Sequence, residues 1–271
     1  MIIQKTWVPY GWGNNIIIYN NLRQIARLTS QSWAAPDWAG SSILQGSPSG
    51  KMYPTSIELS SQELREIELH RLVDIAATQN IIMKEWCLGE LFFKYTVHPP
   101  SDFLAVKFPE SDKVQVGIHL RGTDFFQWNP NAVLDSSYYI AALDECLKDA
   151  DEELEVIIFT DDPSLDSYKK LVNYINSIGV TLQRAPDFGK PTRNHADRVP
   201  SSFLNDFMLM CQCDYLISSP STFCISAGFL GKRKKVVHSS KWINERANLD
   251  DYFWLDLHRG GNQYYSCWKT I

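Results

Sequence analysis

The chain has 271 residues, of which 44% are hydrophobic and 21% charged, a composition typical of a folded globular protein and unlike that of a disordered one. Its formal net charge of −5 excludes a general attraction to nucleic acids or anionic lipids, so any anionic ligand would be held by a few local cations. No window is long and apolar enough to span a membrane, and the N-terminus lacks the pattern of a signal peptide, so we expect a cytosolic protein.

The first half of the chain predicts three elements and a connecting segment. The N-terminal "IIQKTWV" has the composition of a strand, and helices are predicted over 14–29 and 60–79. The pattern of this half is less regular than that of the second, because the stretch from 33 to 58 is rich in Pro, Gly and Ser. Residues 98–113 contain three prolines, which is typical of a linker between two halves.

The second half alternates between strand and helix patterns. Strand patterns cover 114–120, 154–159, 180–185, 214–219 and 234–240, and helix patterns cover 136–150, 163–179, 201–213 and 221–231. A serine cap starts the first of these helices, and Pro163 and Gly179 mark the start and the stop of the second. This alternation predicts a doubly wound sheet of parallel strands with right-handed crossovers.

Polar side chains gather where three of these strands end. His119, Arg121 and Asp124 close one strand, Asp161–Asp162 the next, and Ser221–Thr222 follow a third and begin a helix. Ligands of open parallel sheets bind beyond the carboxyl ends of the strands. A guanidinium beside a Ser/Thr-rich helix N-terminus predicts an anion site, with diphosphate as the obvious occupant.

Each of these features also has a purely structural interpretation. An Arg–Asp pair is often an ordinary salt bridge, and Asp162 or Ser221 could simply cap the helix that follows. Asp206 lies in an otherwise apolar helix, where its carboxylate needs either a structural partner or donor groups of a ligand. The convergence of all of them on one edge of the sheet favours a binding site.

The six cysteines show no C-x-x-C spacing. We therefore predict buried thiols and no zinc site or disulfide framework.

Four stretches, taken in order, resemble the fucosyltransferase superfamily of α1,2-, α1,6- and protein O-fucosyltransferases. They are "VGIHLRGTD", "IFTDDPSL", "NDFMLMCQCDYLISSPSTFCISAGFLG" and, more faintly, "YGWGNN". The likeness is best to the α1,6 and bacterial nodulation enzymes. Their signature is H-x-R-x-x-D, then T-D-D-P, then an Asp-bearing helix that leads to a Ser/Thr-rich strand end. The likeness covers residues 114–231 in the same order and spacing.

The resemblance implies an α/β fold of the GT-B type, in which two Rossmann-like domains face a cleft. Residues 1–108 would form the N-terminal domain on the acceptor side. Residues 109–271 would form the domain that binds the GDP-sugar, with the C-terminal tail packing back on the first domain. No metal and no cofactor would be needed, since GDP-fucose is a substrate.

The resemblance also implies a set of donor-binding residues: His119, Arg121, Asp161, Asp206, Ser221, Thr222 and Asn14. Arg121 would grip the β-phosphate of the departing GDP. His119 and Asp206 would lie around the guanine nucleotide, and Asn14 would bring the first domain to the cleft.

The catalytic residues implied in the same way are Arg121, Asp124 and Asp162. The sequence departs from the α1,6 signature, because Phe125 and Asn129 stand where those enzymes have a lysine and a glutamate that is a candidate base. The general base therefore stays open among four acids: Asp124, Asp162, Glu85 and Glu90.

The function that the resemblance implies is inverting transfer of L-fucose from GDP-fucose to a hydroxyl group of a glycan, a peptide or a small molecule. Two alternatives stay open. One is a transferase for another GDP-sugar, since residues that bind the diphosphate do not select the sugar. The other is an inactive protein that binds nucleotide-sugars, which the missing glutamate leaves open.

Overall fold

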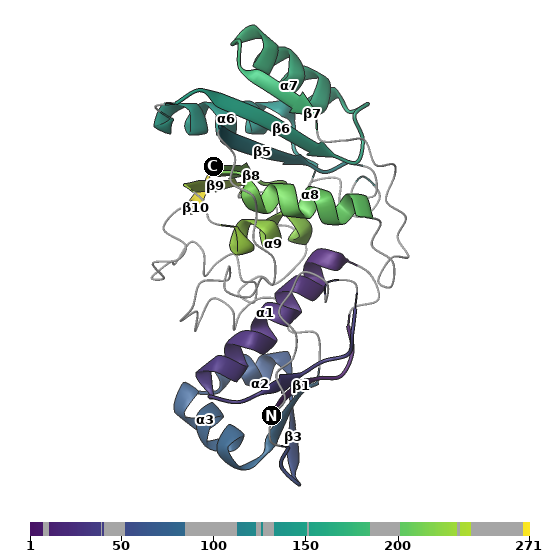
Figure 1. The fold of residues 1–271 in the computed structure, drawn as a ribbon, viewed down its shortest axis with the longest axis vertical. Coiled ribbons are helices and arrows are strands. Elements are labelled where there is room, and N and C mark those ends of the chain that lie inside the picture. Colours follow the sequence, from purple (N-terminus) through teal and green to yellow (C-terminus); the bar gives the residue numbers. More distant parts are fainter. Residues whose placement is uncertain are drawn as a thin grey trace. The chain divides into compact units, whose positions relative to one another are not determined.

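The computed structural model describes residues 1–7, 11–38, 40, 52–84, 113–122, 126, 133–150, 152–184, 201–231, 234–239 and 268–271. The described residues form two compact units, one up to residue 84 and one from residue 113 onward (Figure 1). The predicted boundary at 108/109 and most of the C-terminal tail lie outside the described residues, so both stay predictions.

The first unit contains a four-stranded parallel sheet in the order β2-β1-β4-β3. Its elements are β1 (Ile2–Gln4), α1 (Trp12–Leu28), β2 (Trp33–Ala34), β3 (Ser56–Leu59), α2 (Ser61–Glu66), α3 (Leu69–Thr78) and β4 (Asn80–Met83). The predicted N-terminal strand and first helix are confirmed, whereas β2, β3 and β4 are too short to give a periodic pattern.

Helix α1 is buried over most of its surface, 13 of its 17 residues being enclosed. Its apolar run Ile16–Ile18 therefore packs on more than one side instead of alternating with a solvent face. The helix begins after Gly11, whose φ of +89° lies in the left-handed region. Residues other than glycine rarely adopt this backbone conformation, so the turn needs glycine at this position.

The prediction of one helix over 60–79 is wrong, because the chain breaks into α2 and α3. Ser60 and Glu63 form a reciprocal capping box that starts α2. Ile67 and Glu68 then adopt extended backbone conformations, and α3 begins at Leu69. No Gly or Pro marks this break, so the continuous pattern of apolar residues conceals it.

The second unit contains a six-stranded parallel sheet in the order β10-β9-β8-β5-β6-β7. Its elements are β5 (Val114–Leu120), α6 (Ser136–Asp149), β6 (Leu154–Thr160), α7 (Asp166–Ser177), β7 (Thr181–Arg184), α8 (Ser201–Gln212), β8 (Tyr215–Ile217), α9 (Thr222–Leu230), β9 (Lys235–His238) and β10 (Trp268–Thr270). The predicted α/β class with a parallel sheet in the C-terminal half is confirmed.

Helices cover both faces of this sheet (Figure 1). Val116 and Ile118 of β5 face a core that contains Leu143 of α6 and Leu171 of α7. The alternate residues of β5 point to the other face, where a Cβ at Gly117 would stand 2.8 Å from Sγ of Cys213, directly after α8. The sheet is therefore doubly wound, as the alternation of patterns predicts.

Two helix starts differ from their predictions, and in both cases an aspartate side chain is the reason. Asp135 is the N-cap of α6 and accepts a hydrogen bond from the backbone N–H of Ser137 at 2.8 Å, so the predicted serine cap is wrong. Helix α7 begins at Asp166 and not at Pro163, because Asp162 first forms a turn by accepting from the N–H of Ser164 at 2.9 Å. The predicted stop at Gly179 is confirmed by its φ of +71°.

The four described cysteines are buried thiols, as predicted: Cys146, Cys211, Cys213 and Cys224. None of the helices in the described ranges is both long and apolar enough to cross a membrane.

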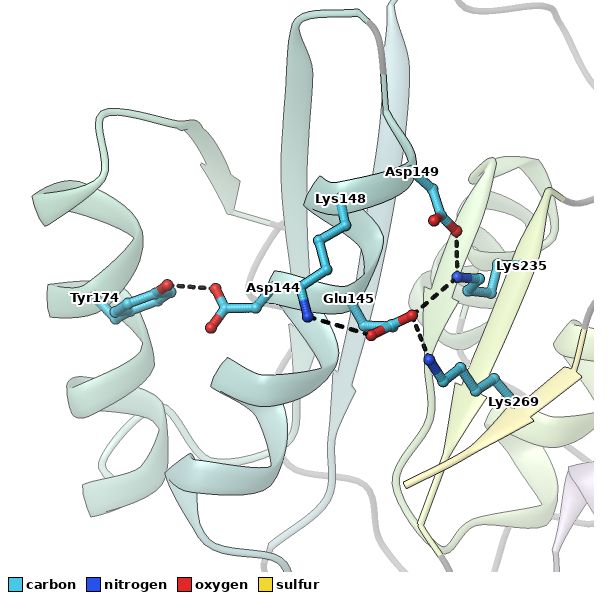
Figure 2. A network of polar contacts seen from close by, with 7 residues as sticks. All are labelled: Asp144, Glu145, Lys148, Asp149, Tyr174, Lys235 and Lys269. Atoms are coloured by element: carbon cyan, nitrogen blue, oxygen red, sulfur yellow. Dashed lines mark hydrogen bonds and ion pairs between the residues drawn. The ribbon is translucent and has the colours of Figure 1, made fainter.

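A network of charges ties the last strand of the chain to α6 (Figure 2). The carboxylate of Glu145 lies 3.6 Å from Nζ of Lys148 and 3.5 Å from Nζ of Lys235, and it also accepts from Lys269 of β10. Lys235, the first residue of β9, pairs with Asp149 as well. This network therefore ties the edge strand β10 and its neighbour β9 to α6.

We predict that Glu145→Gln lowers the midpoint of thermal unfolding by a few degrees, because three lysines then lose the carboxylate that they share. The loss should shrink in about 1 M NaCl, where charges are screened over about 3 Å. Asp166→Asn is the matched control, since it removes a single exposed ion pair with Lys170. Equal effects of the two substitutions, measured by differential scanning fluorimetry, would contradict the network's role.

Candidate functional site

The register of the strands brings the predicted polar clusters to one edge of the second sheet. Leu120 of β5 is level with Thr160 of β6, and Ile118 is level with Ile217 of β8. All three strands are parallel, so the residues that follow them emerge together.

Strand β5 lies at the topological switch point of this sheet. From β5 the chain runs through α6 to β6, on one side of β5, whereas α9 leads from β8 to β9 on the other side. The strand order therefore reverses between β5 and β8. Open α/β sheets bind their ligands at such a point, outside the carboxyl ends of the strands.

An ion pair joins the ends of β5 and β6. Nη1 of Arg121 lies 3.0 Å from Oδ2 of Asp161, and the two side chains are 21% and 7% exposed. Oδ1 of the same carboxylate accepts a hydrogen bond from the backbone N–H of Gly122 at 2.9 Å. Asp161 therefore holds both the side chain and the backbone at the end of β5.

A second contact joins the ends of β5 and β8. Nδ1 of His119 lies 2.6 Å from Oγ of Ser219, and both side chains are buried. Burial, and to a lesser degree the charge of Arg121, lowers the pKa of His119 to about 3, so its imidazole is neutral at physiological pH. A neutral imidazole donates from one nitrogen and accepts at the other, and the hydroxyl of Ser219 can serve either role, so the contact is compatible with both tautomers of His119.

The serine-rich turn after β8 leads directly into α9. Ser221 is the residue before the helix, and its side chain makes no capping hydrogen bond. The hydroxyl of Tyr138 donates to the carbonyl of Ser218 at 2.8 Å and thereby fixes the start of this turn from α6. Thr222 is the first residue of α9. The turn thus presents the positive end of a helix dipole near β5.

The two neighbouring aspartates after β6 have different contacts. Whereas Asp161 bridges to β5, Oδ1 of Asp162 accepts from the N–H of Ser164 and from its hydroxyl at 2.5 Å. Asp162 therefore shapes the turn before α7, but it is not the cap of that helix that the structural interpretation offered, because Leu165 is the residue before α7. Its catalytic role stays a prediction.

Asp206 of α8 carries a buried oxygen without a partner. Its Oδ1 has no hydrogen bond to any group in the part of the chain that the structure describes. Burial raises the pKa of Asp206 to about 7. The next residue, Phe207, packs on Phe223 with ring centroids 5.5 Å apart, and Phe223 lies 6.1 Å from the ring of His119. Two aromatic rings thus connect the helix of Asp206 to the end of β5.

Other predicted residues are not brought to this edge by the described contacts. Asn14 lies in the first turn of α1, in the first unit. Three of the candidate bases lie outside the described residues: Asp124, Glu85 and Glu90. Within the described ranges, no group of three His, Cys, Asp or Glu side chains could hold a metal ion.

The sequence does not single out Tyr138, His238 or Ser239 at this edge, and it gives Ser219 only as the polar end of the strand pattern over 214–219. His238 and Ser239 are buried and end β9, next to β8. The signal that could have found them is the polar "HSS" directly after the apolar residues of β9. Tyr138 gives no such signal, because its position in a helix says nothing of the strand ends it reaches.

A shallow depression lies at the opposite end of the strands. It is lined by Leu147, Leu154 and Val180, near the amino ends of β6 and β7. Its lining includes no cation, so the chemistry of the carboxyl edge marks the better site for an anionic ligand.

Two solved structures are similar to this chain. A FUT1 mutant from Arabidopsis thaliana in complex with GDP is 14% identical, with a TM-score of 0.49 over 86% of this chain and 69% of that chain. POFUT1 in complex with GDP-fucose is 9% identical, with a TM-score of 0.41 over 86% of this chain and 95% of that chain. No curated protein matches this sequence.

A family model described as glycosyl transferase family 11 matches residues 104–251, a span that contains β5, β6, β8 and the helices between them. Because the match covers more than half of the sequence, the chain belongs to glycosyl transferase family 11, a family of fucosyltransferases.

Proposed function

We infer that this chain is an inverting fucosyltransferase that takes L-fucose from GDP-fucose and transfers it to a hydroxyl group of an acceptor. The observation that supports this most strongly is the Arg121 guanidinium, held by Asp161 at the switch point of the sheet. Membership of glycosyl transferase family 11 supports fucose as the sugar.

The diphosphate of the donor would bind between Arg121 and the turn that begins α9. A guanidinium has five N–H donors in a planar fork, so contact with Asp161 through Nη1 does not exhaust its capacity to bind phosphate oxygens. The amino end of α9 adds the positive end of its dipole and small hydroxyl side chains at Ser221 and Thr222.

In the reaction, an acceptor oxygen attacks the anomeric carbon of fucose from the face opposite the diphosphate. The new C–O bond forms while the bond to the β-phosphate oxygen breaks, GDP leaves with the electron pair, and the configuration inverts. Negative charge grows on the leaving phosphate, so Arg121 stabilises the transition state more than the ground state. The acceptor proton passes to a base, for which Asp124, Asp162, Glu85 and Glu90 stay the candidates.

Asp206 would recognise the guanine base. A carboxylate with a buried, unpartnered oxygen suits the adjacent N–H donors on the edge of guanine. Adenine offers one acceptor on the corresponding edge and would leave the carboxylate opposed by a lone pair. The preference for guanine over adenine would therefore come from Asp206. Its buried oxygen has no hydrogen-bond donor among the described residues and would gain one when guanine binds.

The first test is release of GDP from GDP-fucose by the purified protein, followed by mass spectrometry. We expect wild-type protein to release GDP and Arg121→Ala to do so about 100-fold more slowly or worse, because a fixed donor to the leaving group is lost. Arg71→Ala, which removes an exposed arginine of α3, is the matched control and should keep full activity.

The outcomes separate the remaining functions. If the protein consumes a different GDP-sugar and leaves GDP-fucose unchanged, the donor is that other GDP-sugar. Binding of GDP without turnover of any donor or acceptor would make the chain a nucleotide-sugar-binding protein. Failure to bind any guanine nucleotide, in a thermal-shift screen with folded protein, would refute the proposal.

The second test uses the titration of Asp206. Its folded pKa of about 7 lies above the ordinary value of 3.8, so the folded state binds the extra proton between these values. Without ligand, wild-type stability should therefore fall relative to Asp206→Asn as the pH rises through this window, and the difference should stay constant above it. Asp74→Asn, at an exposed position in α3, is the matched control.

Binding of GDP should favour the opposite pH dependence, since the N–H donors of guanine need the ionised carboxylate of Asp206. We expect GDP to bind wild-type protein more tightly at about pH 8 than at about pH 6, beyond any change seen for Asp206→Asn. The same substitution should erase most of the preference for GDP over ADP in calorimetric titrations. An undiminished preference would remove Asp206 from the guanine site.

A further inference from the structure

We propose that Asp161 is a positioning residue that acts through Arg121 and makes no contact with the donor itself. The proposal rests on the proposed function, because it assigns Asp161 the task of holding the guanidinium that grips the diphosphate. It changes the donor-binding role that the sequence resemblance implies for Asp161.

The two oxygens of Asp161 are both committed to the end of β5. One lies 3.0 Å from Nη1 of Arg121, and the other accepts from the N–H of Gly122 at 2.9 Å. Asp161 directly follows β6, and Thr160 is level with Leu120, so the bridge spans two paired strands. Its side chain is only 7% exposed, which keeps the carboxylate inside the edge and not in the space that a ligand would occupy.

Gly122 allows this bridge to form. A Cβ at that position would stand 2.6 Å from Cδ1 of Leu165, at the start of α7. The backbone of Gly122 is therefore pressed against the loop that carries Asp161, and its N–H reaches the carboxylate. The end of β5 and the loop after β6 thus form one packed unit, in which the direction of the guanidinium is set before any ligand binds.

The charge of Asp161 argues against a direct contact with phosphate. A carboxylate has only acceptors when it is ionised, and so has a phosphate group, so the two repel each other. Asp161 also cancels part of the positive charge of Arg121, which weakens the attraction for GDP. Its presence is therefore explained by orientation, because an arginine side chain left to itself loses much rotamer freedom when it binds.

This role predicts a split between binding and turnover. Asp161→Asn keeps an acceptor for the N–H of Gly122 and removes the charge that fixes and neutralises Arg121. We expect turnover of GDP-fucose to fall about 10-fold or more, as for other residues that orient a functional group. GDP affinity should stay unchanged or increase. Asp166→Asn, five residues further along the chain and exposed, is the matched control.

The GDP affinity of a double variant distinguishes a positioning role of Asp161 from a direct contact with the ligand. In Arg121→Ala, Asp161 becomes a buried carboxylate without its cation, which repels the diphosphate and destabilises the fold. Adding Asp161→Asn to Arg121→Ala should therefore restore part of the GDP affinity and part of the lost thermal stability. If Asp161 donated binding energy to the ligand directly, the double variant would bind GDP more weakly than Arg121→Ala.

Three results would overturn the proposal. These are weaker GDP binding by the double variant, a parallel loss of GDP affinity and turnover in Asp161→Asn, and a loss of stability in Asp161→Asn with turnover intact. All three require wild-type protein that binds GDP and consumes GDP-fucose. Wild-type protein that does neither would instead refute the proposed function, together with the role of Asp161 that depends on it.

Discussion

The parallel pairing of β5 with β6 and β8 is the constraint on which the candidate site depends. Because Leu120 is level with Thr160 and Ile118 with Ile217, side chains from three distant parts of the chain emerge at one edge. The apolar cores on both faces of the sheet hold this register, since a shift by one residue would turn Val116 and Ile118 out of the core. The chemistry of the edge is thus a consequence of the packing beneath it.

The ionisable groups at this edge differ in how their charge is handled. Arg121 pairs with the carboxylate of Asp161, His119 is neutral because it is buried, and Asp206 is the acid whose ionisation burial disfavours. Arg121 can therefore bind an anion, and the ionised carboxylate of Asp206 would be stabilised by the N–H donors of a ligand. Both properties suit guanosine diphosphate better than a neutral ligand.

The sequence predicts much of this edge but not its internal pairings. The strand end at Arg121 follows from the alternating pattern before it, and the motifs around it led to the fucosyltransferase superfamily, which the family match confirms. The different contacts of Asp161 and Asp162 could not be predicted from the sequence, because they depend on which residue of β5 is level with Thr160. Ser219 was hidden among four small polar residues, and only the pairing of β8 with β5 selects it as the partner of His119.

The proposed function requires that Arg121, at the end of β5, contacts the diphosphate of a guanine nucleotide. A crystal structure of the protein with GDP tests it most directly. We predict phosphate oxygens within hydrogen-bonding distance of the Arg121 guanidinium, beside the turn from Ser218 to Thr222, with Asp161 still bonded to Gly122. A GDP molecule bound elsewhere, with Arg121 touching no phosphate, would refute the assigned role of Arg121.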